Sequence, residues 1–445
     1  MLKPRTFRGG IHPESNKHFT EGRSIENMPA PAHVVIPLQQ HIGAQCEPIV
    51  QIGEEVQAGQ KIGDSKSPVS SPVHASISGK VIAIEPRPHP VSPCDVMSIV
   101  IERSEITMHD ELYTMHEIDW ASLTAQQIKE KIREAGIVGM GGAAFPTHIK
   151  LSPPPEKKID TVILNGVECE PYLTADHRLM LENPAEILLG LNIILKVLGI
   201  KRAFVAIEEN KPDAIEVMQK TLSGGDYLDG AKIEIAPLKV KYPQGAEKQL
   251  IKAITNREVP SGGLPFDVGV LVQNIGTAFA IYQAVALGKP LIERVLTVSG
   301  DGIKEPKNLR VRIGTLFSDV LQYCGGLREN ISKIIMGGPM MGIAQYTTEV
   351  PVIKGTSGIL VLQAASDEKE GPCIKCGRCV DICPMGLMPN RIADYAELDN
   401  FEAAKEYGVL DCMECGACAH VCASHRPVVH LVKYVKSQLA KQPKK

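Results

Sequence analysis

Two cysteine runs near the C-terminus are the part of this sequence best suited to chemistry. The first reads Cys373-Ile-Lys-Cys376-Gly-Arg-Cys379-Val-Asp-Ile-Cys383-Pro384, and the second reads Cys412-Met-Glu-Cys415-Gly-Ala-Cys418-Ala-His-Val-Cys422. In the Cys-x2-Cys-x2-Cys-x3-Cys spacing, three thiolates of a tight loop bind one cubane iron–sulfur cluster, and the fourth binds the cluster of the other run. The sequence therefore predicts two [4Fe–4S] clusters. One is bound by Cys373, Cys376, Cys379 and Cys422, and the other by Cys412, Cys415, Cys418 and Cys383.

Two other chemistries fit these cysteines less well. Structural zinc sites usually use two Cys-x2-Cys pairs, and disulfides need an oxidising compartment, for which the sequence shows no signal peptide. Residues 388–411, between the runs, have apolar side chains at helical spacing, which predicts two short helices. A further amphipathic helix is predicted for residues 428–439. The C-terminal region therefore resembles the helical type of two-cluster ferredoxin domain.

A glycine-rich segment is the second stretch that could bind a cofactor. It reads Gly139-Met-Gly141-Gly142-Ala-Ala-Phe145-Pro-Thr-His-Ile-Lys150 and follows a predicted helix, residues 126–135. A G-x-G-x-x-A loop of the dinucleotide-binding type would follow a strand and open a helix, so a standard dinucleotide fold is disfavoured here. Closely spaced glycines still let backbone N–H groups approach a phosphate or a flavin ring, and Lys150 could add positive charge.

Polar residues also follow two predicted strands of an α/β region. The strand at residues 159–164 is followed by Asn165-Gly-Val-Glu168-Cys-Glu170-Pro, and the strand at residues 268–272 is followed by Gln273 and Asn274. The turn Tyr242-Pro-Gln-Gly245-Ala-Glu247-Lys opens a predicted helix. Because ligands of open α/β sheets bind at the carboxyl ends of the strands, we expect these side chains to lie near one site.

The first hundred residues have the pattern of an all-β domain. Short β-branched runs alternate with glycine turns in residues 34–37, 53–63 and 72–84, which predicts two layers of hairpins. The pattern resembles the barrel-sandwich domains that carry biotin or lipoate on an exposed lysine. Lys66 falls in the corresponding gap but lacks the flanking residues of those carriers, so we expect an unmodified packing domain.

The composition excludes several classes of protein. The chain has 445 residues, enough for about three or four domains, and its formal net charge of −3 offers no basic excess for nucleic acid. The most apolar windows, residues 187–200 and 268–287, are interrupted by polar residues and fall short of the roughly 20 apolar residues of a membrane-spanning helix. We therefore expect no nucleic-acid partner and no membrane span.

Together these motifs resemble two related families. The glycine loop, the Asn165 strand end and the Tyr242 turn are similar to the FMN- and NADH-binding flavoprotein subunit of respiratory complex I, and residues 294–338 resemble its β-grasp domain. The N-terminal Phe-Arg-Gly-Gly-Ile-His-Pro segment, the hairpin pattern and the cysteine runs resemble the RnfC family of the Rnf electron-transport complex over essentially the whole chain. The resemblance implies a multi-domain α/β protein. Its expected domains are a barrel-sandwich hybrid (residues 1–105), an FMN/NAD-binding α/β domain (106–290), a β-grasp domain (291–350) and a helical two-cluster ferredoxin domain (351–445).

The resemblance also implies which residues line the cofactors. FMN would lie between Gly139, Gly141, Gly142, Lys150 and Asn165 on one side and Tyr242, Gly245 and Asn274 on the other. Glu170 and Glu247 would face NAD(H), with Phe145 under its adenine and Glu168 beside them. Val167 and Ala246 stand where the complex I flavoprotein has acids, so the resemblance is weaker for the nucleotide contacts than for the flavin contacts. We expect no general acid or base, because the hydride passes directly between the nicotinamide and flavin rings.

The expected function follows from these cofactors. A hydride carries two electrons and a cubane cluster passes one, so a flavin is the natural converter between them. We expect a peripheral subunit, on the cytoplasmic side of the bacterial cell membrane, of an ion-translocating ferredoxin:NAD+ oxidoreductase. Its partners would be NAD(H), the other membrane and peripheral Rnf subunits and, indirectly, ferredoxin. Two alternatives remain: the cobalamin reductase of diol-utilising microcompartments, whose barrel-sandwich segment resembles a C-terminal addition, and a flavin-free electron-relay scaffold.

Overall fold

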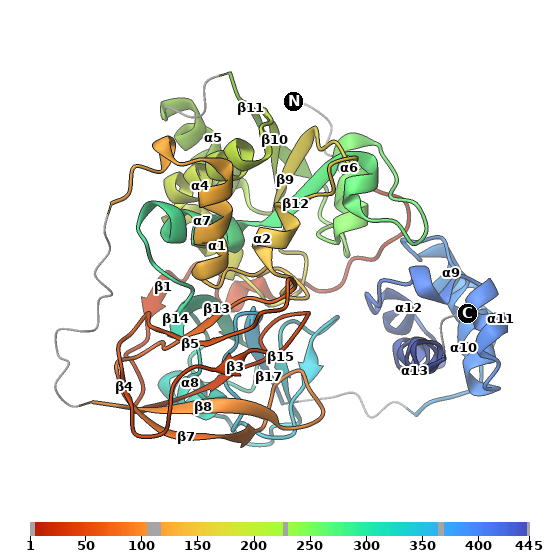
Figure 1. Ribbon diagram of the computed structural model, residues 1–445. Coiled ribbons are helices and arrows are strands. Elements are labelled where there is room, and N and C mark those ends of the chain that lie inside the picture. Colours follow the sequence, from red (N-terminus) through yellow and green to blue (C-terminus); the bar gives the residue numbers. More distant parts are fainter. Residues whose placement is uncertain (1–4, 105–116, 226–229, 364–368, 443–445) are drawn as a thin grey trace.

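The computed structural model describes residues 5–104, 117–225, 230–363 and 369–442, and the strands within them form four sheets. The predicted boundary between the first two domains, at residue 105, lies outside the described residues. Figure 1 shows the three parts that contain these sheets packed into one body, with a helical C-terminal part beside it. Among the helices of the described ranges, none has both the length and the apolar character needed to cross a membrane.

The N-terminal domain consists of two antiparallel layers, as predicted. Its larger sheet has the order β2 (His33–Pro37), β8 (Val96–Arg103), β7 (Gly79–Arg87) and β4 (Glu55–Val56), and the smaller sheet has the order β3 (Glu47–Pro48), β5 (Lys61–Asp64) and β6 (Val73–His74). The side chains of Val34, Ile36, Ile62, Val81 and Ile99 are buried between the layers. They come from both sheets, because alternate residues of each strand point inward.

The second domain is built on a parallel sheet. Its strand order is β11 (Lys232–Leu238), β10 (Arg202–Glu208), β9 (Thr161–Gly166) and β12 (Val270–Asn274). Its helices are α1 (Ala125–Glu134), α2 (Thr147–Lys150), α3 (Ala175–Glu182), α4 (Pro184–Leu198), α5 (Pro212–Gly224), α6 (Glu247–Thr255) and α7 (Ile275–Ala286). Apolar residues of α1, α4 and α7 pack on one face of the sheet, and those of α6 pack on the other. Both faces are therefore covered, as the near-continuous apolar strands predict.

The strand register of this sheet places two polar residues side by side. In the parallel pair β9–β12, Asn165 is the partner of Asn274, and both stand at the carboxyl ends of their strands. The two asparagines therefore lie at one edge of the sheet, where open α/β sheets bind ligands.

The third part is a mixed six-stranded sheet around one helix, α8 (Phe317–Tyr323). The strand order is β1 (Ile25–Asn27), β14 (Lys307–Arg312), β13 (Glu293–Ser299), β17 (Gly358–Leu362), β15 (Lys333–Met336) and β16 (Ile343–Ala344). Strands β1 and β17 lie outside residues 291–350, the range expected for this domain. The alternation of apolar and polar residues in a short strand does not show which sheet the strand joins. Strand β17 is buried and lies between β13 and β15.

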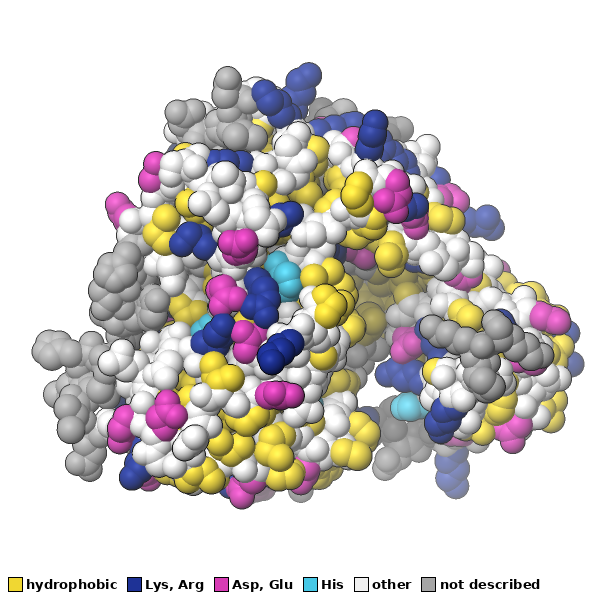
Figure 2. All heavy atoms as spheres, viewed as in Figure 1, with side chains coloured by type: hydrophobic (Ala, Val, Ile, Leu, Met, Phe, Trp, Pro, Cys, Tyr) yellow, Lys and Arg dark blue, Asp and Glu magenta, His cyan; other side chains and the backbone are white. Residues whose placement is uncertain are grey.

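The C-terminal domain is helical, as predicted. It contains α9 (Arg378–Asp381), α10 (Pro389–Glu397), α11 (Phe401–Glu406), α12 (Ala417–His420) and α13 (Val428–Lys441). The two helices predicted between the cysteine runs are α10 and α11, and the predicted terminal helix is α13; all three are confirmed. Ile392, Ala396, Val432 and Val435 form their shared core. Figure 2 shows this domain as a separate lobe with a hollow between part of it and the main body.

Residues 5–20 precede the first hairpin layer and pair with other domains instead. Arg5 forms a β-bridge with Leu238 at the end of β11, and Ile11 forms one with Tyr242. In Figure 1 the red N-terminal chain passes between the α6 side of the second domain and the blue C-terminal domain. We call residues 5–20 the strap.

Candidate functional site

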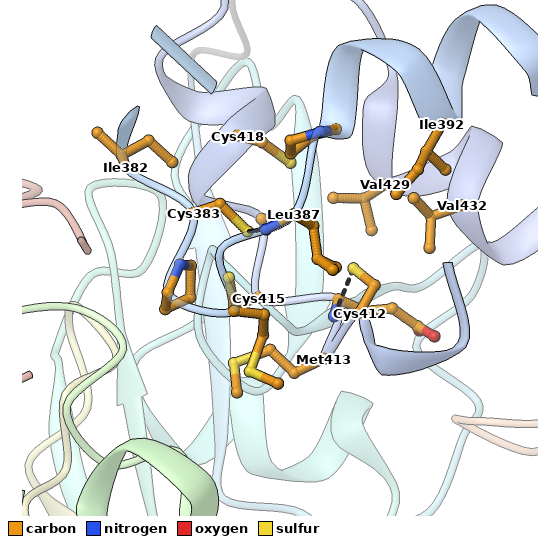
Figure 3. Close-up of a pocket in the computed structure, with 15 residues that line it drawn as sticks. Ile382, Cys383, Leu387, Ile392, Cys412, Met413, Cys415, Cys418, Val429 and Val432 are labelled. Atoms are coloured by element: carbon orange, nitrogen blue, oxygen red, sulfur yellow. Dashed lines mark hydrogen bonds between the residues drawn. The ribbon is translucent and has the colours of Figure 1, made fainter. Parts of the chain in front are cut away.

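Four cysteine side chains line one cavity in the C-terminal domain (Figure 3). Cys412, Cys415 and Cys418 come from the second run, and Cys383 comes from the end of the first. The turn at Gly416, which has φ of 78°, leads directly into α12 and brings Cys415 and Cys418 to the same side. The structure therefore joins the fourth cysteine of one run to three cysteines of the other, the exchange expected of paired cubane clusters.

The surroundings of these thiols suit a metal cluster. Burial, with the charge of the neighbouring thiols, raises the pKa of Cys415 to about 11 and that of Cys418 to about 12. Four thiolates can therefore share this cavity only with cations between them. The backbone N–H of Leu387 points to Sγ of Cys383 and that of Glu414 to Sγ of Cys412, each at 3.4 Å. Such N–H donors are typical of iron–sulfur sites, so the donor set fits a [4Fe–4S] cluster.

The other four cysteines of the two runs are Cys373, Cys376, Cys379 and Cys422. The pKa of the Cys379 thiol is raised by burial and also by the neighbouring thiols of Cys373 and Cys376. The side chain of Cys376 is exposed. Cys422 follows α12 as Cys383 follows α9, and it is partly buried. In the described parts of the chain, no three His, Cys, Asp or Glu side chains are arranged to hold a single metal ion. Cys383, Cys412, Cys415 and Cys418 surround a space instead of meeting at a point.

The glycine loop lies against the end of β12. A Cβ on Gly141 would be 2.8 Å from Nδ2 of Asn274, so only glycine permits this approach. Asn274 accepts the N–H of Gly276 at 2.8 Å and donates to Asp176 at 2.6 Å. Its amide is thereby fixed beneath the loop. Gly142 faces open space, and the loop follows helix α1, which agrees with the prediction that it is not a standard dinucleotide loop.

The end of β9 contacts the turn before α6. Nδ2 of Asn165 donates to the carbonyl of Gly245 at 2.8 Å. Lys150, at the end of α2, forms a 2.8 Å ion pair with Glu247, the first residue of α6. Lys150 and Glu247 keep about a quarter and a third of their surface exposed (25% and 38%), so both can still meet a ligand. The structure thus brings together Gly141 with Asn274, Asn165 with Gly245, and Lys150 with Glu247.

The other predicted acids are held by backbone amides. Glu168 accepts the N–H groups of Asp176 and His177 and so caps the start of α3. Glu170 accepts the N–H groups of Met340 at 3.1 Å and Met341 at 2.9 Å. Burial raises the pKa of Glu170 to about 7. These two carboxylates therefore hold the chain around the site, whereas the ring of Phe145 lies half-buried in the glycine loop.

Tyr242 connects the two candidate sites. Its ring is 2% exposed, and its hydroxyl donates to the carbonyl of Cys415 at 2.7 Å. Three residues further on, Gly245 contacts Asn165. The family resemblance placed Tyr242 beside a flavin, but no local pattern indicated that the side chain also reaches the cysteine loop.

Several supporting residues were not expected from the sequence. Arg294 is buried and donates to the carbonyls of Met140 and Lys354. Lys17 is buried in the strap and donates to the carbonyls of Glu168, Glu170 and Leu173 at 2.9, 3.0 and 2.5 Å. Each is a single polar residue outside any motif, so no local pattern could have revealed it.

Buried polar atoms without partners mark the same edge of the sheet. Within the described ranges, Oγ1 of Thr147, both amide atoms of Gln244 and Nε2 of Gln273 have no hydrogen-bond partner. Thr147 follows the glycine loop, Gln244 precedes Gly245, and Gln273 precedes Asn274. Buried polar groups are normally satisfied by protein, water or ligand, so these residues fit a site that binds a polar cofactor such as FMN.

Comparison with protein families assigns the four parts of the chain. Residues 5–105 match the RnfC barrel sandwich hybrid domain, 132–283 the Nuo51 FMN-binding domain, 295–344 the SLBB domain and 366–423 the 4Fe-4S dicluster domain. A crystal structure of an NAD+-reducing [NiFe]-hydrogenase in the air-oxidized state is similar with a TM-score of 0.51 and 17% identity, over 74% of this chain and 69% of that chain. That likeness supports the fold alone. The matches to an FMN-binding domain and to a 4Fe-4S dicluster domain show that the protein is an iron–sulfur flavoprotein.

Relatives of known name match nearly the whole chain. It is 51% identical to the C subunit of the proton-translocating ferredoxin:NAD+ oxidoreductase complex of Clostridium ljungdahlii, over 98% of this chain and 94% of the relative. It is 46% identical to the C subunit of the Na+-translocating complex of Acetobacterium woodii, over 100% and 99%. It is 44% identical to the C subunit of the ion-translocating oxidoreductase complex of Rhodobacter capsulatus, over 99% and 84%. The chain belongs to this family, the RnfC subunits of the ion-translocating ferredoxin:NAD+ oxidoreductases.

Proposed function

We propose that this chain is the NAD(H)-reactive peripheral subunit of an ion-translocating ferredoxin:NAD+ oxidoreductase and acts at the cytoplasmic face of the membrane. It works with the other subunits of that complex and, through them, with ferredoxin. Support comes from relatives with this name along the full chain and from the FMN-binding and dicluster domain matches. The alternatives gain no such support: the barrel-sandwich domain is N-terminal, and residues 132–283 match an FMN-binding domain.

The proposed cofactor contacts follow the geometry of that edge. FMN is held by the glycine loop, Lys150 and the asparagines of β9 and β12, with Gly245 and Tyr242 on the opposite side. Glu247 and Phe145 face the nicotinamide nucleotide, because both keep exposed surface beside the loop. Glu168 and Glu170 act through the backbone that they hold. The eight cysteines bind two clusters in the sets given by their spacing.

The observation that carries this proposal is the contact between Tyr242 and Cys415. It places the cavity of Cys383, Cys412, Cys415 and Cys418 next to the strand-end site, whereas Cys376 is exposed on the other set. We call the first set the inner cysteine set and Cys373, Cys376, Cys379 and Cys422 the outer set. This geometry supports an electron path from the flavin-type site to the inner set and then to the outer set, in which Cys376 is exposed.

The residues of the chain have a positioning task. FMN, when bound, accepts or donates a hydride with NAD(H) and exchanges single electrons with iron–sulfur clusters. The loop and the two asparagines would hold and orient FMN, and Tyr242, which is buried, would lie between this site and the inner cysteine set. No proton needs to be moved by a side chain in the hydride step, so the site requires alignment more than acid–base groups.

An anaerobic titration with NADH tests the proposal. The purified chain should contain about one FMN and, at four irons per cubane, about eight irons. NADH should bleach the flavin absorbance and produce the EPR signals of reduced clusters. A chain with zinc in place of iron, or one that stays oxidised under excess NADH, would contradict the proposal.

A further inference from the structure

The strap contacts the loop that carries the first inner cysteine. The N–H of Gly10 donates to the carbonyl of Ile382 at 2.8 Å. Gly9 has φ of 79°, and a Cβ there would lie 2.9 Å from the carbonyl oxygens of both Ile382 and Cys383. Glycine at this position therefore allows the strap to lie directly on the backbone of a cluster ligand, and a larger residue would push the two apart.

The next residue of the strap pairs with the flavin-type domain. Ile11 and Tyr242 exchange backbone hydrogen bonds of 2.8 and 2.9 Å, and Ile11 is 6% exposed. The carbonyl of Phe7 accepts from Nζ of Lys241 at 3.0 Å. Within five residues the strap thus joins the turn that carries Tyr242 to the loop that carries Cys383.

Further along, Lys17 ties the strap to the strand end. Its ammonium group donates to three carbonyls of the chain between Glu168 and Leu173, the segment that follows β9. Lys17 is 5% exposed, and burial lowers its pKa to about 8. A buried lysine with three carbonyl acceptors is costly to move, so this end of the strap is fixed.

Two direct contacts between the domains lie close to those of the strap. Tyr242 reaches the carbonyl of Cys415, and Nε2 of Gln249 on α6 donates to the carbonyl of Pro384 at 3.0 Å. Both contacts, like that of the strap, fall on the inner cysteine set or on the residues beside it. The outer set receives none of these three contacts.

We propose that the strap is a positioning element for electron transfer: residues 9–11 set the placement of the inner cysteine set relative to the flavin-type site. The proposal rests on the proposed function, because it concerns the step between flavin and cluster. The strap does not touch substrate. Its role is to fix the distance between the flavin-type site and the inner cysteine set, which the fold of each domain alone does not determine.

The test compares two alanine substitutions at glycines of positive φ. Gly9→Ala places a Cβ against the carbonyls of Ile382 and Cys383, whereas Gly53→Ala carries similar backbone strain with no heavy atom within 4 Å. Gly10→Ala is the second test variant, since its Cβ would lie 2.7 Å from the carbonyl of Tyr242. Holoprotein of each variant is mixed with NADH anaerobically, and flavin and cluster reduction are followed separately.

We expect flavin reduction by NADH to be unchanged in all variants. Cluster reduction should slow on the order of tenfold in Gly9→Ala and Gly10→Ala, and stay normal in Gly53→Ala. Cleavage by trypsin after the exposed Arg8 should also become faster in the two strap variants, which is a readout independent of electron transfer. Dithionite should still reduce both clusters fully.

Two results would overturn the inference. One is cluster reduction at the wild-type rate in both strap variants with faster tryptic cleavage, which would show that a loosened strap leaves the step unaffected. The other is loss of iron from both variants, which would make the contact a requirement for cluster retention. Failure of NADH to bleach the wild-type flavin would count against the proposed function instead.

Discussion

Glu170 shows how a single carboxyl can organise this site. It stands after β9, and its oxygens accept two amides from residues 340 and 341, which belong to the six-stranded-sheet domain. Desolvation raises its pKa from 4.5 to about 7 despite these donors. The folded protein therefore holds a proton on Glu170 at pH values where the unfolded chain has released it.

This shift makes stability depend on pH. Because the folded pKa is raised, the contribution of Glu170 to stability is greatest below about pH 4.5 and is lost as the pH rises through about 7. Glu170→Gln keeps an oxygen acceptor but cannot ionise, so its stability should change less than that of the wild type between pH 5.5 and pH 8, by about 2 kcal/mol. Urea unfolding of wild type and variant at both pH values measures the difference. Parallel pH profiles of the two proteins would refute the prediction.

At the scale of elements, the loop between β16 and β17 joins three domains. Lys354 in this loop is 1% exposed and donates to Pro72 of the barrel-sandwich domain at 2.6 Å and to Gly136, just after α1, at 2.7 Å. Its own carbonyl accepts from Arg294, which also holds Met140 of the glycine loop. The barrel-sandwich domain is thereby connected to the flavin-type loop through one buried lysine.

Removing this ammonium group should weaken the packing of the domains. Lys354→Met keeps the length of the side chain but leaves two buried carbonyls without a donor, which should cost about 1–3 kcal/mol. Lys66→Met is the control, because Lys66 is exposed on the same barrel-sandwich domain and should change stability by less than about 0.5 kcal/mol. Urea unfolding followed by circular dichroism and Trp120 fluorescence compares them. Equal midpoints would show that Lys354 does not join the domains energetically.

The elements also show what a sequence can and cannot predict. The helices between the cysteine runs and the strand ends at Asn165 and Asn274 follow from local periodicity and turn residues, so they were predictable. The joining of β1 and β17 to one sheet, and the positions of Lys17 and Arg294, depend on residues distant in the chain. The spacing of the cysteines predicts which of them lie together, because one cluster needs four thiolates. A single buried lysine has no sequence pattern that predicts its partners.

At the scale of the whole molecule, the two cysteine sets differ in environment. Cys415 is 7% exposed and lies against Tyr242, while Cys376 is exposed. A path from the strand-end site to the surface therefore meets the inner set first. In the outer set, Cys376 is exposed and Cys373, Cys379 and Cys422 are partly buried.

Serine substitutions should separate the two sets. Cys415→Ser and Cys376→Ser should each reduce iron from about eight to about four per chain while FMN stays bound. In Cys376→Ser the remaining cluster should still be reduced by NADH, whereas in Cys415→Ser the remaining outer cluster should be reduced slowly or not at all. Iron and flavin content with EPR after NADH addition measures this. The opposite pattern would reverse the order of the sets.

The strap also has a consequence for how the protein is made. Residues 7–20 are synthesised well before their partners Tyr242, Asn308 and Ile382. They therefore lack these hydrogen bonds while the intervening domains are synthesised. Domains usually fold one after another during synthesis, but the contact of Gly10 with Ile382 can form only after the C-terminal domain has been synthesised. The strap contact with the cysteine loop is therefore among the last contacts of the chain to form, although it joins residues near opposite ends of the sequence.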